Sequence, residues 1–109
     1  MAELTIESQE SIIEKVRRLL DVLTSQKLRI FAAYLYGSYA VGNPHQDSDI
    51  DVAIISPDFS DARMDDWIRL NVPASHIDAR MEVMAFKPEQ FCDEHPLAWE
   101  IKTKGVKLL

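Results

Sequence analysis

The first quarter of the chain carries apolar residues at the spacing of an amphipathic helix, which we expect over residues 9–26. The apolar stripe is formed by Ile12, Val16, Leu19, Leu20 and Leu23. Charged side chains such as Glu14 and Arg17 fall mostly off this stripe and would face solvent. Ser8 or Ser11 can cap the helix, and Ser11 with Glu14 fits a capping box. This segment therefore predicts a helix that packs through one side.

Three short apolar runs farther along the chain predict β-strands over residues 29–36, 50–56 and 80–86. The first run ends at Gly37 and the second is stopped by Pro57. Because glycine and proline interrupt regular structure, they mark strand ends. The third run is rich enough in apolar residues to lie in a sheet.

The remaining segments predict short helical elements. We expect a single helical turn at residues 38–41, a helix over residues 61–71 and another turn around residues 89–92. Pro96 suits the first position of a last helix and Gly105 suits its end. Strands and helices thus intermix, and the predicted fold class is α/β (or α+β), with a small mixed β-sheet flanked by helices.

The composition is that of an ordinary globular protein. The chain has 109 residues, of which 47% are hydrophobic and 28% charged, and this suits one domain spanning residues 1–109. No apolar run approaches the roughly 20 residues that cross a bilayer, and the acidic N-terminal residues do not resemble a secretory signal. The single cysteine, Cys92, excludes an internal disulfide. We therefore expect a cytoplasmic protein without a membrane partner.

The formal net charge of −6 argues against direct binding of nucleic acid, because phosphate binding relies on lysine and arginine. It is compatible with a small nucleotide held through a metal, and it suits a basic protein partner. A domain this small has limited room for both a core and a nucleotide pocket. We therefore expect a homo- or hetero-oligomer.

Two aspartates at the start of the second predicted strand are the sharpest chemical feature. Residues two apart in a strand point to the same face, so Asp49 and Asp51 project together, with Ile50 and Val52 on the other side. Like charges this close destabilise the fold unless a cation neutralises them, and carboxylates are usual ligands of magnesium. Two metal ions about 4 Å apart can be bridged by such a pair. The alternative is a solvated strand end, and Asp47 is either an outer-shell acid or a turn cap.

A glycine-serine turn precedes these aspartates. Gly37 allows the backbone to approach a ligand closely, Ser38 offers its hydroxyl and nearby N–H groups to a phosphate, and Gly42 permits a second tight turn. The alternative is an ordinary turn. If the two strands are adjacent, a phosphate-binding turn and a metal-binding pair face one another.

This motif resembles that of a known family. Gly37-Ser38, followed by Ser48-Asp49-x-Asp51, fits the GS-x(n)-DxD signature of the polymerase-β-like nucleotidyltransferase superfamily. The motif matches over about 15 residues, and the order of helices and strands matches loosely over nearly the whole chain. The chain looks like a minimal nucleotidyltransferase (MNT) domain, which implies the fold of that superfamily.

The resemblance also implies roles for individual residues. Asp49 and Asp51 would hold magnesium, with two ions bound, and Glu82 supplies the third catalytic carboxylate, with Asp78 as the alternative. The nucleotide-binding residues are then Gly37, Ser38, Gly42 and Ser48. ATP is the implied substrate, its AMP passing to an acceptor hydroxyl while pyrophosphate leaves.

Small members of this family resemble antitoxins whose partners are HEPN-domain proteins, and some are thought to inactivate the partner by adding AMP to a tyrosine. The resemblance implies that role here. The chain departs from the family in one respect: many members carry arginine after the Gly-Ser pair, whereas residues 37–42 here contain no basic side chain. This departure favours a non-catalytic module that neutralises a toxin by contact. A third possibility is the subunit of a small-molecule nucleotidyltransferase.

Several other residues admit structural interpretations. Tyr34 and Tyr36 are expected in the core, and Tyr39 is expected to pack rather than to stack on a base. His45 is expected in a solvated loop, and Cys92 lacks the setting of a nucleophile. Tryptophans 67 and 99, with Leu97, Ile101 and the C-terminal residues, either cover the sheet or leave an apolar patch for a partner.

Overall fold

Four strands form one mixed sheet in a computed structural model that describes residues 6–45, 48–60 and 62–109. The strands are β1 (Ala32–Tyr36), β2 (Ile50–Ile55), β3 (Met81–Phe86) and β4 (Val106–Lys107), in the spatial order β3-β2-β1-β4. β1 pairs antiparallel with both β2 and β4, whereas β2 and β3 run parallel. β3 therefore lies at one edge of the sheet.

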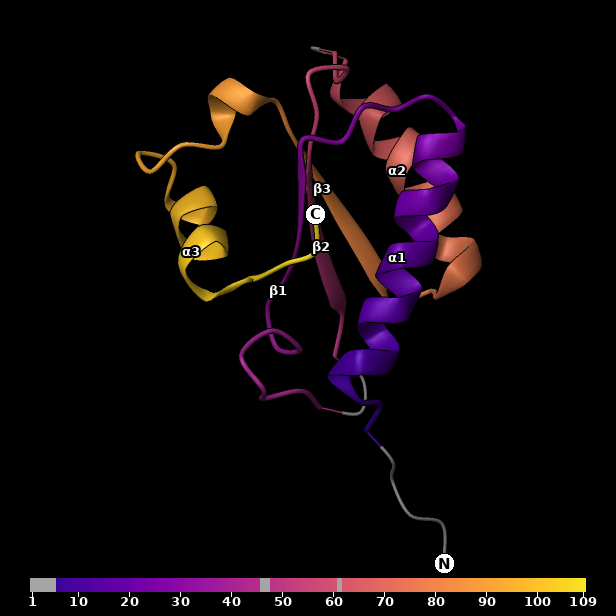
Figure 1. Ribbon diagram of the computed structural model, residues 1–109, viewed down its shortest axis with the longest axis vertical. Helices are drawn as coiled ribbons and strands as arrows, with labels where there is room; N and C mark the ends of the chain where they lie inside the picture. Colours follow the sequence, from indigo (N-terminus) through magenta and orange to yellow (C-terminus); the bar gives the residue numbers. More distant parts are fainter. Residues whose placement is uncertain (1–5, 46–47, 61) are drawn as a thin grey trace, which may run out of the picture.

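Helices cover both faces of this sheet. α1 (Gln9–Ser25) and α2 (Arg63–Ile77) lie on one face, and α3 (Pro96–Lys104) lies on the other (Figure 1). A short 3₁₀ helix, η1 (Pro88–Gln90), follows β3. The predicted mixed α/β fold is confirmed. No helix within the described ranges is long and apolar enough to cross a membrane.

The alternation of side chains along β2 separates two packed layers. Ile50, Val52 and Ile54 belong to the larger cluster beneath α1 and α2. Ala53 and Ile55 belong to a smaller cluster with Phe86 of β3 and Ala98 and Ile101 of α3. Because residues two apart share a face, Asp51 lies on the α3 side of the sheet. α3 packs over Ala53 and Ile55, whereas Asp51, near the start of β2, is only partly buried.

The start of α1 differs in detail from the prediction. Ser8 is the N-cap, and its hydroxyl accepts the N–H of Ser11 at 3.2 Å. Ser11 lies inside the helix, where its hydroxyl donates to Glu7. The capping box of Ser11 with Glu14 was therefore wrong, because the helix begins one turn earlier than that box requires. The helix itself, with its five buried apolar residues, is confirmed.

The second helix is longer than predicted and passes through Pro73. The expected span of 61–71 was too short; residue 61 itself lies outside the described residues. A proline inside a helix removes one backbone hydrogen bond and usually favours termination. Here Leu70 and Ala74 on either side are fully buried, so packing against α1 and β3 outweighs that loss.

Two smaller differences concern the sheet. β1 begins at Ala32 rather than residue 29, because the backbone N–H and the guanidinium of Arg29 both bind Asp58 instead of joining the strand ladder. The short strand β4 was not predicted, since two residues carry no recognisable periodicity. It pairs with the edge of β1 at Tyr34 and Leu35.

Candidate active site

Asp51 stands between two polar side chains on the open part of the sheet. In the strand register it is opposite Tyr36 of β1 on one side and Glu82 of β3 on the other. Side chains at paired positions share a face, so the three lie side by side. Asp51 is partly buried, whereas Glu82 and Asp49, which precedes β2, are exposed. The sheet thus brings Glu82 to the two aspartates of the motif.

Burial and repulsion both act on the central carboxylate. Partial burial raises the pKa of Asp51 above its ordinary value of 3.8, and the negative charges of Asp49 and Glu82 raise it further. Each effect disfavours the ionised form. A cation bound here would remove the repulsion. Neighbouring carboxylates that repel one another are expected at a site that holds a positively charged ligand.

Gly37 is in direct contact with Asp51. It follows β1 with a positive φ of 78°, a conformation that glycine adopts without strain. A Cβ atom at this position would overlap Asp51 Oδ2 and lie 3.2 Å from Cγ. The turn and the aspartate are therefore two parts of one site.

The turn that begins at Gly37 has the hydrogen bonding of a helix start. The carbonyl of Gly37 accepts the N–H groups of Ala40 and Val41 at 3.0 and 3.2 Å. The N–H groups of Ser38 and Tyr39 have no acceptor among the residues that the structure describes. Ser38 is partly exposed, so its N–H is available to an anion, whereas Tyr39 is buried. Gly42 also has a positive φ, of 76°, but the space around it is open.

Ser48 closes the loop that leads into β2. Its hydroxyl accepts the N–H of His45 at 2.6 Å, and its own N–H donates to the carbonyl of His45 at 3.1 Å. This bond leaves the hydroxyl proton of Ser48 able to donate to a ligand. His45 is exposed. Asp47 lies outside the described residues.

Tyr36 was expected only in the core, yet it also belongs to the site. It is partly buried against the α3-side cluster. Burial, together with the charges of Asp51 and Glu82, raises the pKa of Tyr36 to about 12. At neutral pH its hydroxyl is protonated, as that of an ordinary tyrosine is, and it can donate a hydrogen bond. The sequence shows that Tyr36 directly precedes Gly37 of the motif. It does not show that Tyr36 pairs with Asp51, because that depends on the register of the two strands.

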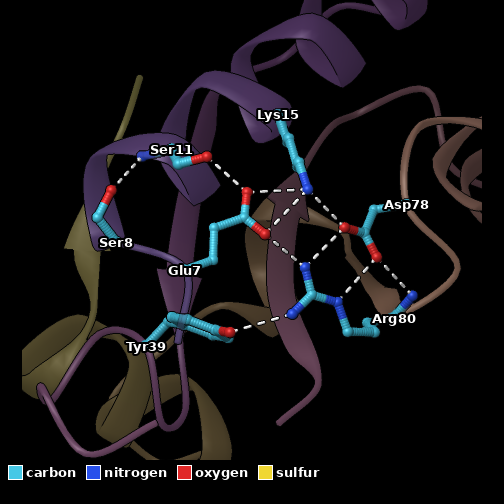
Figure 2. Close-up of polar contacts among 7 residues, drawn as sticks. All are labelled: Glu7, Ser8, Ser11, Lys15, Tyr39, Asp78 and Arg80. Carbon is cyan, nitrogen blue, oxygen red and sulfur yellow. Dashed lines mark hydrogen bonds and ion pairs between the residues drawn. The ribbon is translucent and has the colours of Figure 1, made fainter. Parts of the chain in front are cut away.

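Asp78, the alternative third carboxylate, is engaged elsewhere. It forms ion pairs with Lys15 of α1 and Arg80, each at 2.8 Å (Figure 2). These partners, Arg80 above all, hold the pKa of Asp78 well below its usual range. The strand register places Glu82, and not Asp78, beside Asp51.

The donor set suits a divalent magnesium ion in its chemistry, since hard cations prefer carboxylate oxygens. Within the described part of the chain, however, no three or more Asp, Glu, His or Cys side chains are grouped so as to hold a metal ion. Asp49 and Glu82 are both exposed and free to adjust. The fit therefore rests on the chemistry of the donors and on the charge repulsion at Asp51.

The remaining assignments are structural. Tyr39 packs as predicted: it is 1% exposed, and its hydroxyl accepts a hydrogen bond from Arg80 at 3.1 Å. Tyr34 packs against the ring of Phe91, with centroids 5.3 Å apart. Of the residues expected to cover the sheet or remain free, Ile101 is buried, whereas Trp67 and Trp99 are about half exposed.

Comparison with known families agrees with this geometry. The family model described as "Polymerase beta, Nucleotidyltransferase" matches residues 8–109. The chain therefore belongs to the polymerase beta nucleotidyltransferase family, and the resemblance inferred from the Gly-Ser and DxD motif is confirmed. No curated protein matches the chain by sequence.

Several solved structures share the fold. A Sulfolobus solfataricus protein assigned as a nucleotidyltransferase aligns with a TM-score of 0.65 at 16% identity, over 98% of this chain and 87% of that one. A toxin–antitoxin structure with AMP-PNP gives 0.63 at 26% identity, over 89% and 72%. A tyrosine-to-alanine variant of the toxin–antitoxin MntA–HpeT gives 0.62 at 26% identity, over 85% and 70%.

Proposed function

We propose that this protein is a magnesium-dependent nucleotidyltransferase that transfers AMP from ATP to a hydroxyl group of a partner protein. The observation that carries the proposal is the contact between Gly37 and Asp51, which joins a phosphate-binding turn to a carboxylate cluster. Membership of the nucleotidyltransferase family supports the reaction class. The proposal is for a single minimal domain acting in the cytoplasm, where ATP is available.

Each residue then has a defined task. Ser38, with the backbone N–H groups at the turn, binds the terminal phosphates, while Gly37 lets the chain approach them. Gly42 and Ser48 shape the loop on either side of the nucleotide. Asp49, Asp51 and Glu82 hold magnesium, two ions being expected. When bound, magnesium neutralises charge on the triphosphate and on the leaving pyrophosphate.

The reaction is a substitution at the α-phosphorus of ATP. The acceptor oxygen forms a bond to this phosphorus, the bond to the oxygen that bridges the α- and β-phosphates breaks, and pyrophosphate leaves. Glu82 is exposed beside the acidic pair and takes the proton of the acceptor hydroxyl. Tyr36, kept protonated, can donate a hydrogen bond to an oxygen of the substrate.

The acceptor that we propose is a toxin. Two solved structures 26% identical to this chain come from toxin–antitoxin systems, and one of them contains AMP-PNP. This likeness supports an antitoxin role, and the resemblance of the motif to minimal nucleotidyltransferases implies a HEPN-domain protein as the partner in a hetero-oligomer. AMP added to a tyrosine of the partner would inactivate it.

A specific observation favours a second function. Residues 37–42 contain no lysine or arginine to bind the triphosphate. A protein that neutralises its toxin by contact alone, with the acidic site unused, would account for this. The small-molecule transferase subunit has no comparable support from the described contacts.

Intact mass spectrometry separates the two functions. The purified chain is incubated with ATP, magnesium and the protein encoded by the adjacent gene, in parallel with an Asp49→Ala/Asp51→Ala variant. We expect the partner to gain one or more AMP units only with the wild-type chain. An unmodified partner that is nevertheless bound and silenced by both chains would mean that the function is binding.

Folding of the double variant needs its own control. Removing two neighbouring acids relieves repulsion, so the variant should unfold at a temperature no lower than that of the wild type. A loss of AMP transfer is then attributable to chemistry. A variant that unfolds early would instead assign the aspartates a structural role.

A further inference from the structure

A groove of about 580 Å³ runs along the outer edge of β3. Arg63 and Trp67 of α2 line one side, Met84 and Ala85 of β3 form its floor, and Gln90 and His95 line the far side. A second hollow of about 330 Å³ adjoins it, because Arg63 and Trp67 line both. Neither hollow is assigned a role by the catalytic chemistry described above.

The floor of the groove is an open sheet edge. β3 is the outer strand, and the N–H and carbonyl of Val83 are paired with the side-chain amide of Asn71, at 2.9 and 3.1 Å. Ala85 is two residues farther along, so its N–H and carbonyl point the same way. Among the residues that the structure describes, neither group of Ala85 has a hydrogen-bond partner. The groove thus presents one free backbone donor and one free acceptor.

The groove also reaches the catalytic face. Met84 lines it, is 42% exposed and lies on the same face as Glu82, two residues away. At the rise of a strand this separation is about 7 Å. A chain lying along the groove could therefore place a side chain over Glu82 and Asp51.

We propose that this groove binds an extended segment of the acceptor protein. The segment pairs with Ala85 as the amide of Asn71 pairs with Val83, since a residue of an extended chain presents its own backbone N–H and carbonyl on the same side. Trp67 and Met84 pack against its apolar side chains. Its hydroxyl-bearing residue then lies beside Glu82. The catalytic part of this assignment rests on the proposed AMP transfer, whereas the binding part does not.

Matched tryptophan substitutions test the binding surface. Trp67 and Trp99 are 53% and 50% exposed, and only Trp67 lines the groove. The probes are overlapping 15-residue peptides that cover the protein encoded by the adjacent gene, with affinity measured by titration calorimetry. We expect at least one peptide to bind, Trp67→Ala to weaken it at least tenfold, and Trp99→Ala to leave it unchanged. Equal effects of the two substitutions, or no bound peptide, would overturn the proposal.

Hydrogen exchange at one amide tests the strand pairing. With a bound peptide at saturation, exchange of the Ala85 N–H, followed by NMR, should slow at least tenfold. An Ala85→Pro variant removes this outward N–H, and proline is tolerated on the open side of an edge strand. It should lower peptide affinity. Undiminished exchange at Ala85 in the bound state would overturn strand pairing.

The two proposals fail in different ways. If peptides bind at Ala85 but no AMP is transferred, the proposal of a peptide-binding groove is retained and the proposal of AMP transfer is rejected. If AMP is transferred with the same Michaelis constant for the partner in Trp67→Ala and wild type, the proposal of AMP transfer is retained and the proposal of a peptide-binding groove is rejected.

Discussion

Gly37 shows how a single residue can join two parts of a site. Its positive φ turns the chain out of β1, and the missing side chain lets that turn lie against Asp51. Gly42 has nearly the same backbone conformation but no neighbour within contact distance. The two glycines therefore separate the effect of backbone strain from the effect of contact with the carboxylate.

We expect Gly37→Ala to be much more harmful than Gly42→Ala. Both substitutions place a Cβ in the left-handed region, which costs about 1 to 2 kcal/mol. Only Gly37→Ala also pushes Asp51 aside, so it should lower the free energy of unfolding by about 2 to 4 kcal/mol. It should also reduce the rate of AMP transfer at least tenfold more than Gly42→Ala does. Urea unfolding and the mass assay measure both effects. Equal losses in the two variants would show that the contact with Asp51 is unimportant.

At the scale of elements, α2 packs against β3 through apolar side chains, and within the described residues one side-chain amide, that of Asn71, adds the hydrogen bonds between them. Asn71 is buried, accepts the N–H of Val83 and donates to its carbonyl, and it also donates to the carbonyl of Trp67 in its own helix. A polar residue in this position completes the edge strand as a neighbouring strand would. It also fixes where the open edge, and with it the groove, begins.

Asn71→Leu should therefore destabilise the protein although leucine is apolar and of similar size. The N–H and carbonyl of Val83 would lose their buried partners, which costs about 2 to 3 kcal/mol. Ser75→Ala serves as the control, because Ser75 is exposed on the same helix and its hydroxyl donates to the carbonyl of Val72 one turn back in that helix. Chemical denaturation measures both. A leucine variant as stable as the control would mean that water replaces the lost bonds.

At the scale of the whole molecule, one charge network connects segments distant in sequence (Figure 2). Glu7, before α1, pairs with Lys15 at 2.9 Å and with Arg80, before β3, at 2.7 Å. Arg80 in turn donates to Tyr39 in the turn that follows Gly37. The network thus holds the turn after Gly37, α1 and the start of β3 in one arrangement.

Because of this network, the free energy of unfolding depends on pH in the acidic range. The hydrogen bond from Ser11 and the pairing with Lys15 and Arg80 lower the pKa of Glu7 from 4.5 to about 2. A lowered carboxylate pKa stabilises the fold above the unfolded value, and that contribution is lost as the pH falls through the folded value. We expect Glu7→Gln to be less stable than wild type by about 1 to 2 kcal/mol at pH 7, with the difference shrinking between pH 4.5 and 2.

Thermal unfolding across this pH range provides the measurement. Glu14→Gln is the control, since Glu14 is exposed on α1, the helix that Glu7 precedes. It should follow the wild-type profile. A Glu7→Gln profile parallel to wild type throughout would contradict the assignment of the low pKa to this network.

Local patterns in the sequence were sufficient to predict most helices and strands of this protein and the motif of its candidate site. The apolar spacing of α1, the three main strands and the boundary residues of α3 depend on neighbours in the chain, so they could be predicted from it. The Gly-Ser and DxD motif indicated the family for the same reason, because its glycines and aspartates lie within about 15 residues. Strand periodicity alone also predicted that Asp49 and Asp51 share a side. Asp49 lies just before β2, and its charge acts on Asp51.

Contacts between distant segments were decided only by the tertiary structure. The pairing of β2 with β3 set Glu82 rather than Asp78 beside Asp51, and the ion pairs of Asp78 reach back to α1. Packing around Pro73 carried α2 past its expected end. The role of Asn71 and the open edge at Ala85 likewise depend on which strand lies outermost. Strand order and register are set by the burial of whole faces, and no short stretch of sequence contains that information.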